Sequence, residues 1–211
     1  TLKIVTATAG FLLLPLVYLL GREIEDHAFG LLAALLTGIS YWATTISRVG
    51  LRFPLAPLFV ALVLLFLLRG LRRGARNDFL LAGLFLGAGL YGYSPFRVAP
   101  VLAAVAVIWF ALWSPARGAR ARLFENAVLL FGTTLVVIAP LLRYALEAPR
   151  MFWYRTLTRV GDTEKTIEGS PLLVFLSNQW RALLAFNWRG DVVWVNTVPL
   201  APLLDFISGA L

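Results

Sequence analysis

Arginines that directly follow long apolar stretches are the residues of this sequence best suited to chemistry. Arg48 and Arg52 lie in the run SRVGLR, and Arg97 ends the run YSPFR, which begins at Tyr93. A guanidinium group presents a planar fork of N–H donors that can hold a phosphate through two parallel hydrogen bonds. Arg48 and Arg52 are four residues apart, within reach of one anion. These residues form the candidate substrate-binding site, with a phosphate-bearing ligand.

A second interpretation of these arginines needs no ligand. Long basic side chains at the ends of membrane helices often keep their stems in the apolar phase and extend the charged group to lipid headgroups. At the level of the sequence, lipid anchoring and phosphate binding both stay open.

Several other chemistries are excluded by composition. The chain has no cysteine, so a disulfide framework and a thiolate metal site are impossible. His27 is the only histidine, which rules out a histidine-based metal centre or catalytic triad. The sequence also lacks a P-loop and a GxGxxG turn between a strand and a helix. We therefore expect no metal and no cofactor.

The elements that must position the arginines are six apolar stretches. Each has about 15 to 20 residues, close to the roughly 20 that a helix needs to cross the hydrocarbon core. The chain is 60% hydrophobic and 14% charged, with a mean hydropathy of +0.81. Together these features predict an all-α, polytopic transmembrane helical bundle. The stretches are Ile4–Leu20, Ala28–Ser47, Pro54–Leu68, Phe79–Phe96, Val98–Trp113 and Leu123–Leu142.

The net charge of +8 could indicate nucleic-acid binding, but the arginines lie at the ends of apolar stretches, where membrane proteins place them. We therefore expect membrane lipid and no nucleic acid as a partner. The excess of arginine over lysine, with much Ala, Leu and Gly, suggests a bacterial protein of the inner membrane. Gly83 and Gly87 form a pattern of small residues that predicts close helix packing.

Alternate loops differ in their arginine content. The loops Gly21–His27, Arg69–Asp78 and Ser114–Arg122 hold eight arginines, whereas the loops around Arg48–Phe53 and at Arg97 hold three. Short cytoplasmic loops carry the excess of basic residues. This rule predicts that the first set is cytoplasmic and that the candidate arginines lie at the outer face.

Three regions follow from this pattern: a transmembrane region over residues 1–142, an extracytoplasmic loop over 143–197, and the start of a truncated transmembrane helix over 198–211. Within the loop, apolar residues at helical spacing in Pro171–Phe186 are interrupted by polar ones. This favours an amphipathic helix in the outer interface, with a spanning helix as the alternative. The acids of the loop are expected to be exposed to solvent. Its tryptophans are expected to anchor the loop at the membrane interface. They are Asp162, Glu164, Glu168, Asp191, Trp153, Trp180, Trp188 and Trp194.

The segments GLLAALLTGISYWATTISRVGLR, PLFVALVLLFLLRGLRRG and FLLAGLFLGAGLYGYSPFR, with FNWRGDVVWVNTVPLAPLLDFISGAL, resemble a known family. It is the bacterial branch of the protein O-mannosyltransferase and aminoarabinose-transferase superfamily, membrane glycosyltransferases of the GT-C fold. The resemblance covers nearly the whole chain, which we interpret as a fragment.

The resemblance implies an enzyme that moves a sugar from a polyprenyl-phosphate donor to a protein, glycan or lipid acceptor at the outer face. In that family an aspartate of the first outside loop acts as the base. The corresponding loop would precede Thr1, so no catalytic residue is transferred, and the fragment is expected to be inactive. Arg48 and Arg52 match outer-face groups near the donor phosphate.

Two other classes of function remain as alternatives. A transporter or lipid flippase would place ionisable residues within spans or break helices around a central site, and the spans show neither clearly. A non-catalytic membrane scaffold is the third interpretation.

Overall fold

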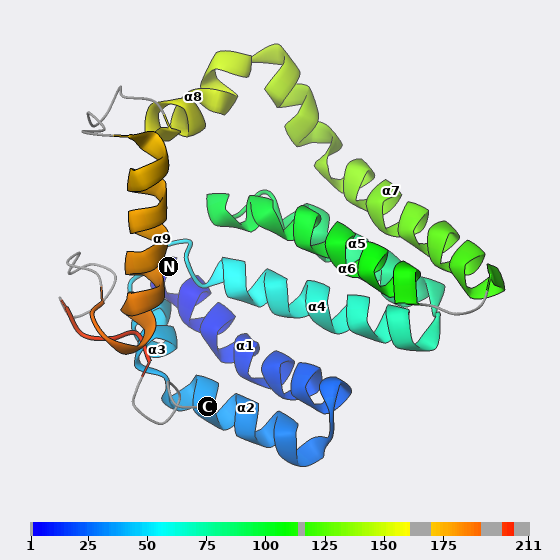
Figure 1. The fold of residues 1–211 in the computed structure, drawn as a ribbon, viewed down its shortest axis with the longest axis horizontal. Helices are drawn as coiled ribbons and strands as arrows, with labels where there is room; N and C mark the ends of the chain where they lie inside the picture. Colours follow the sequence, from blue (N-terminus) through cyan, green and yellow to red (C-terminus); the bar gives the residue numbers. More distant parts are fainter. Residues whose placement is uncertain (1, 114–116, 161–169, 191–199, 205–211) are drawn as a thin grey trace. The chain divides into compact units, whose positions relative to one another are not determined.

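The computed structural model describes residues 2–113, 117–160, 170–190 and 200–204 (Figure 1). Over these residues the chain is helical and contains no strand. It divides into two compact units, Thr1–Ile138 and Ala139–Leu211, which are described separately. The helices are α1 (Leu2–Ile24), α2 (His27–Ile39), α3 (Tyr41–Arg48), α4 (Leu55–Arg73), α5 (Arg76–Gly89), the 3-10 helix η1 (Ser94–Val98), α6 (Ala99–Trp113), α7 (Arg117–Glu147), α8 (Pro149–Val160) and α9 (Pro171–Asn187).

In the first unit, successive helices run back and forth through tight connections. Helix α1 packs against α2, α3 and α4, and α4 packs against α5, α6 and η1 (Figure 1). Asp26 begins α2, because its side chain accepts a hydrogen bond of 2.8 Å from the backbone N–H of Phe29. Gly74 ends α4 in the left-handed conformation, with φ of 67°, which costs glycine little. Only Gly74 and Ala75 separate α4 from α5.

Close helix contacts hold this unit together, and the packing predicted from Gly83 and Gly87 is confirmed. A Cβ atom on Gly83 would collide with the carbonyl oxygen of Leu130 in α7, and one on Gly87 would lie 2.6 Å from Cβ of Val137. The Thr134 hydroxyl donates to Gly83 O at 3.1 Å and to Leu130 O at 2.9 Å. Such contacts matter in lipid, where apolar burial alone does not drive helices together. The buried core of this region contains Val63, Leu67, Phe79, Leu86, Phe96 and Leu130.

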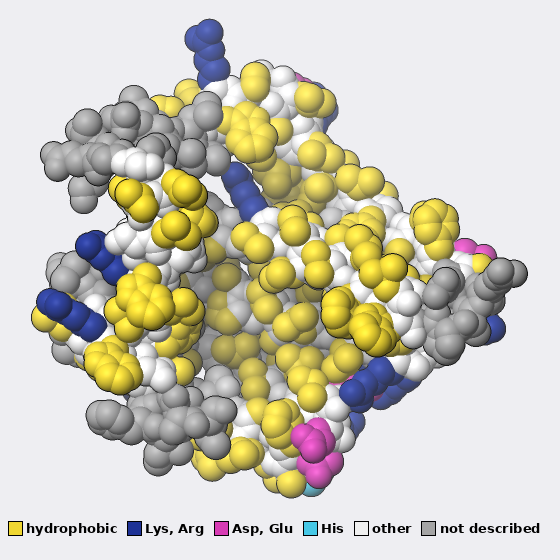
Figure 2. Space-filling view, in the orientation of Figure 1, with side chains coloured by type: hydrophobic (Ala, Val, Ile, Leu, Met, Phe, Trp, Pro, Cys, Tyr) yellow, Lys and Arg dark blue, Asp and Glu magenta, His cyan; other side chains and the backbone are white. Residues whose placement is uncertain are grey.

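Four helices in the described part of the chain are long and apolar enough to cross a membrane. They confirm an all-helical membrane protein but not the expected number of six spans. Large hydrophobic side chains cover much of the surface, including Val101, Val105 and Ile108 of α6. One of the groups of charged side chains in Figure 2 lies near the right-hand ends of α1, α2 and α4. The four segments are Lys3–Ile24, Leu55–Arg73, Ser94–Trp113 and Ala121–Glu147.

Two of the expected spans are shorter or broken. The stretch Ala28–Ser47 forms two helices, because Ser40 has an extended backbone with ψ of 121° and its N–H bonds to Thr37 O at 3.3 Å. Serine and threonine offer the backbone local alternatives to helical hydrogen bonds. Within the stretch Phe79–Phe96, the α-helix ends at Gly89. A glycine-containing turn and Pro95 follow it and lead into η1.

In the second unit, α9 forms at the predicted position, residues 171–187. Its apolar side chains, including Leu172, Phe175 and Trp180, are exposed. Whether this helix lies parallel to the membrane stays a prediction. Residues 200–204 are not helical, and the rest of the expected helix over 198–211 lies outside the described residues, so that helix stays a prediction. Asp162, Glu164, Glu168, Asp191 and Trp194 lie outside the described residues.

Candidate functional site

The four candidate residues all lie at one end of the first unit, which we call the Arg48 end and define by residues 48–54 and 92–98. Arg48 is the last residue of α3, and Arg52 lies in the connection to α4. Both side chains are exposed, and neither has a hydrogen bond or an ion pair within the described part of the chain. Both guanidinium groups are therefore able to bind an added anion.

A ring contact joins Tyr93 to the same end, and Arg97 follows four residues later in η1. The ring of Tyr93 packs against Phe53, the neighbour of Arg52, with 4.9 Å between centroids. Arg97 lies in η1 and is exposed. Gly92 approaches the start of α4, since a Cβ on it would lie 4.0 Å from Cβ of Leu55. The structure thus brings together two segments that are about 45 residues apart in the sequence.

Lys3 is a further cation at this end, and the sequence reasoning missed it. Gly50 is buried, with φ of 65°, and the position of a Cβ on it lies 3.0 Å from Cγ of Lys3. The N-terminus of α1 therefore lies against the connection that carries Arg48 and Arg52. No spacing signal could have revealed this, because Lys3 and Gly50 meet only through the packing of α1 on α3.

A groove of about 230 Å³ extends from Arg48 between α1, α2 and α3. Its walls are mainly small or apolar residues, and Arg48 is the only charged residue among the described ones that line it. The volume is below the roughly 300–1,000 Å³ typical of pockets that enclose a whole drug-sized ligand. The groove therefore suits part of an elongated molecule. Its lining includes Ala7, Gly10, Phe11, Leu14, Gly38 and Ala43.

Three hydroxyl residues also line the groove, but their protons are used within their own helices. Thr37 donates to Ala33 O at 2.8 Å, Thr44 to Ser40 O at 2.9 Å and Ser47 to Ala43 O at 2.7 Å. Hydroxyls that are bonded in this way have no free proton to offer a ligand. The groove is therefore chemically more apolar than its residue types suggest.

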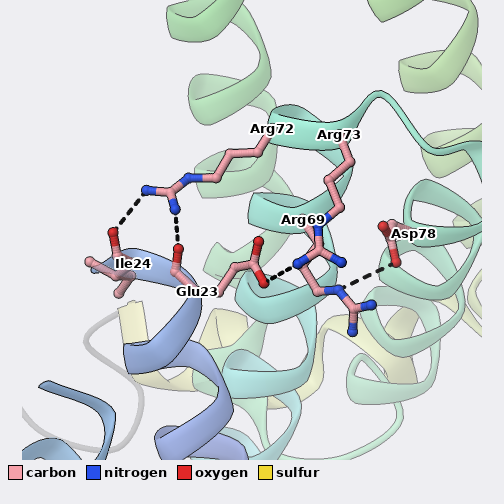
Figure 3. A network of polar contacts seen from close by, with 6 residues as sticks. All are labelled: Glu23, Ile24, Arg69, Arg72, Arg73 and Asp78. Atoms are coloured by element: carbon pink, nitrogen blue, oxygen red, sulfur yellow. Dashed lines mark hydrogen bonds and ion pairs between the residues drawn. The ribbon is translucent and has the colours of Figure 1, made fainter. Parts of the chain in front are cut away.

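The opposite end of the unit, which we call the Arg72 end and define by residues 22–27, 69–78 and 122–126, is also rich in arginine. Here Arg69, Arg72 and Arg73 contact carboxylates or backbone carbonyls (Figure 3). Arg72 donates to the carbonyl oxygens of Glu23 and Ile24, the latter at 2.9 Å. These are terminal carbonyls of α1, which have no partner inside the helix. Arg72 of α4 therefore caps α1.

Carboxylates at this end lie within ion-pair distance of three further arginines. Arg73 contacts the Glu23 carboxylate at 2.6 Å. Arg69 lies 3.9 Å from Asp78 (Figure 3), too far for a hydrogen bond, and its Nε has no hydrogen-bond partner in the described residues. A third pair, Arg76 and Glu125, connects α5 to α7 at 3.4 Å.

The two ends of the first unit therefore differ in their content of acidic residues. The sequence of residues 1–138 contains five acids, and all five lie at the Arg72 end. Among the described residues of the first unit, no carboxylate lies at the Arg48 end, which favours the approach of an anion there. No group of three or more His, Cys, Asp or Glu residues that could hold a metal occurs in the described ranges. The acids are Glu23, Glu25, Asp26, Asp78 and Glu125.

The second unit has a separate cavity of about 700 Å³ at the C-terminal part of α9. Arg181 and Arg189 line it, and both are exposed. Backbone hydrogen bonds from Leu203 and Leu204 to the carbonyls of Ala185 and Phe186 hold the returning chain against α9. No residue of this cavity was expected to bind substrate.

The apolar helices define a helical membrane protein. Its cationic Arg48 end, which lies beside an apolar groove, suits a ligand that has a negatively charged group and an apolar part. Comparison with protein families matches residues 1–144 to the dolichyl-phosphate-mannose–protein mannosyltransferase family, and the chain belongs to that family. No curated protein and no solved structure matches it. The resemblance seen in the sequence is thereby confirmed. The general function is glycosyl transfer at a membrane, from a polyprenyl-phosphate donor to a protein or glycan acceptor.

Proposed function

We propose that this chain forms part of an enzyme that transfers a sugar from a polyprenyl-phosphate donor to an acceptor hydroxyl at the outer face of the membrane. Arg48 and Arg52 hold the donor phosphate, and Tyr93 and Arg97 border the same site. The enzyme belongs to a bacterial inner membrane and has the GT-C architecture. The observation that carries the proposal is a pair of guanidinium groups with no partner among the described residues, at the end of the unit without acids.

The backbone at the Arg48 end supports a site made of side chains. Helix α4 begins there, and the positive end of its dipole favours an anion. However, the N–H groups of Leu55 and Ala56 already donate to the carbonyls of Arg52 and Phe53 at 3.3 and 3.2 Å. These amides are not free to bind a ligand. Phosphate recognition therefore falls to the guanidinium groups.

Glycosyl transfer explains why a fixed positive charge is useful here. The bond between the sugar carbon and the phosphate oxygen breaks, and the leaving phosphate gains negative charge. Cations already in position stabilise that charge in the transition state. The acceptor hydroxyl also needs a carboxylate to take its proton. We assign that base to no residue of this chain.

The test measures transfer of labelled sugar from a polyprenyl phosphate by the full-length protein carrying Arg48→Ala or Arg52→Ala. Losing a hydrogen bond to a charged group costs roughly 1.5–3 kcal/mol. If the bond acts in the transition state, the rate falls about ten- to a hundredfold. Arg→Lys at either position should recover only part of the rate, because lysine keeps the charge but not the planar fork.

Arg76→Ala is the matched control. Its side chain is 71% exposed and it pairs with Glu125 at the other end of the unit, so we expect no change in rate. Wild-type rates in both Arg48→Ala and Arg52→Ala, with normal expression, would show that these arginines are lipid anchors only.

A further inference from the structure

The cavity of the second unit carries charges that the proposed function does not use. Arg181 and Arg189 line it, and neither side chain has a hydrogen bond or an ion pair within the described part of the chain. We propose that this cavity binds the head group of one anionic phospholipid, with both guanidinium groups on its phosphate. The proposal is independent of the proposed function, because no described residue of the cavity belongs to the Arg48 end.

The side of α9 that carries Arg181 lies opposite the apolar face of the helix. At 3.6 residues per turn, Leu172, Leu176 and Leu183 fall within about 40° of one another, and Arg181 is about 180° from Leu172. The three leucines are exposed. An interfacial helix buries such a face roughly 5–10 Å into the boundary between head groups and acyl chains. Since a helix is about 10–12 Å wide, Arg181 would then lie at the depth of the lipid phosphates.

The backbone at the cavity does not oppose an anion. The last carbonyls of a helix carry a partial negative charge, but here following N–H groups cover them. The N–H groups of Trp188 and Arg189 both donate to Leu184 O, at 2.8 and 3.0 Å. The Leu203 N–H donates to Ala185 O at 3.0 Å. The two guanidinium groups therefore dominate the electrostatics of the described lining.

The remaining described walls are small or apolar, with Ala182, Leu184 and Leu200 among them. Gly190 fixes one wall, because a Cβ on it would collide with the carbonyl oxygen of Ala201. The volume of about 700 Å³ falls within the range of pockets that enclose a small ligand.

The charge of the cavity selects the kind of ligand. No acid is among the described lining residues, so the repulsion between the two arginines is relieved by an added anion. A phosphodiester has two free oxygens that match the fork of a guanidinium group. Cations beside apolar walls are therefore complementary to a phosphate that is attached to glycerol and acyl chains.

Arg181→Gln and Arg189→Gln remove one charge each from the cavity. Both side chains are exposed, and glutamine and arginine have similar helix propensities, so the fold should not weaken. Thermal unfolding without added lipid checks this point. Arg→Lys at the same positions keeps the charge but loses the planar fork, and should restore only part of the binding.

Arg150→Gln is the matched control within the second unit. Arg150 is the second residue of α8 and is also exposed, but it does not line the cavity. The substitution therefore removes the same charge from the same unit outside the cavity. Arg48→Ala is the second control, because it removes an unpaired arginine from the first unit.

The measurement is binding of radiolabelled phosphatidylglycerol to the full-length protein in a neutral detergent. We expect Arg181→Gln and Arg189→Gln each to weaken binding about tenfold, the lower end for a hydrogen bond between charged groups, since both arginines are exposed. Arg150→Gln and Arg48→Ala should bind as the wild type does. Unlabelled phosphatidylcholine with the same acyl chains should not displace the label, and neither should glycerophosphoglycerol, the head group without chains.

Wild-type affinity in both Arg181→Gln and Arg189→Gln would overturn the proposal. An equal loss in Arg150→Gln would do the same, because binding would then follow the total charge and not the cavity. Displacement by phosphatidylcholine would show that the phosphate charge is not recognised. If glycerophosphoglycerol displaced the label as well as phosphatidylglycerol does, the cavity would be a site for soluble anions and the phospholipid assignment would be wrong.

Discussion

The two ends of the first unit both carry arginines, but they use them in different ways. At the Arg72 end, guanidinium groups bind carboxylates and the terminal carbonyls of α1. At the Arg48 end, Arg48 and Arg52 have no such partner in the described residues. The same residue type therefore stabilises the fold at one end and is available to a ligand at the other.

The distribution of acids accounts for this difference. A carboxylate beside Arg48 would satisfy its charge internally and compete with a phosphate. With every acid of residues 1–138 at the Arg72 end, no carboxylate from the described part of this unit lies beside Arg48 or Arg52. A count of arginines alone would rate the Arg72 end as the better anion site. The pairing seen in the structure reverses that order.

The largest expected effect concerns the sides of the membrane on which the two ends lie. The sequence has no cysteine, so a single introduced thiol gives an unambiguous label. Leu51→Cys at the Arg48 end and Asn77→Cys at the Arg72 end are both exposed positions. From the arginine asymmetry, we expect an impermeant thiol reagent added to intact cells to label Leu51→Cys fully and Asn77→Cys not at all.

Permeabilised cells provide the control for this experiment, because both thiols should then react. Labelling of the two positions from the same side of the membrane would contradict the topology. The proposal that sugar transfer takes place at the outer face of the membrane would then also be wrong.

Residue patterns were sufficient to predict the helical class, the membrane environment and the position of α9. They did not predict where helices break. The apolar run through Ser40 was predicted as one span. In the structure, the extended backbone of Ser40 divides this run into α2 and α3. Hydrophobicity measures preference for lipid and does not report on local hydrogen bonding by Ser and Thr. The break matters here because it places α3 against Gly10 of α1 and so forms the groove.

The candidate site shows the same limit. Arg48, Arg52, Tyr93 and Arg97 were identified because each closely precedes or follows an apolar run. Lys3 was not, since its approach to Gly50 depends on tertiary packing between α1 and the α3–α4 connection. The pairing of Arg72 with the end of α1 spans 48 residues to Ile24. Such long-range contacts have no signature in local spacing.

The next effect in size concerns the Arg72 end. Arg72→Ala removes both donors to the terminal carbonyls of α1. Because the site is exposed and water can replace part of the contact, we expect a loss of about 1–2 kcal/mol in the free energy of unfolding. The transfer rate per folded molecule should stay unchanged. Thermal unfolding in detergent and the sugar-transfer assay measure the two quantities on one preparation.

Arg22→Ala is the control for this variant. Arg22 lies in the last turn of α1, like the capped carbonyls, but its contact in the described residues is with the ring of Tyr18, with 5.9 Å to its centroid. Its loss should cost less, about 0.5–1 kcal/mol. An Arg72→Ala protein that unfolds at the wild-type temperature but has lost transfer would contradict the contrast between the two ends.

The smallest expected effect is the coupling between Arg73 and Glu23. Their charged groups are 2.6 Å apart, but the Arg73 side chain is 52% exposed and that of Glu23 is 12% exposed. Exposed ion pairs contribute about 0.2–1 kcal/mol, and the burial of Glu23 favours the upper part of that range. A double-mutant cycle with Glu23→Gln and Arg73→Gln isolates the coupling energy from other effects of each change.

The same cycle on Arg76 and Glu125, which are 71% and 59% exposed, should give a smaller value. Raising the salt concentration should reduce both couplings, and the more exposed pair should lose the larger fraction. If neither pair showed coupling at low salt, the Arg72 end would be as open to added anions as the Arg48 end. The comparison would then depend on the capping role of Arg72 alone.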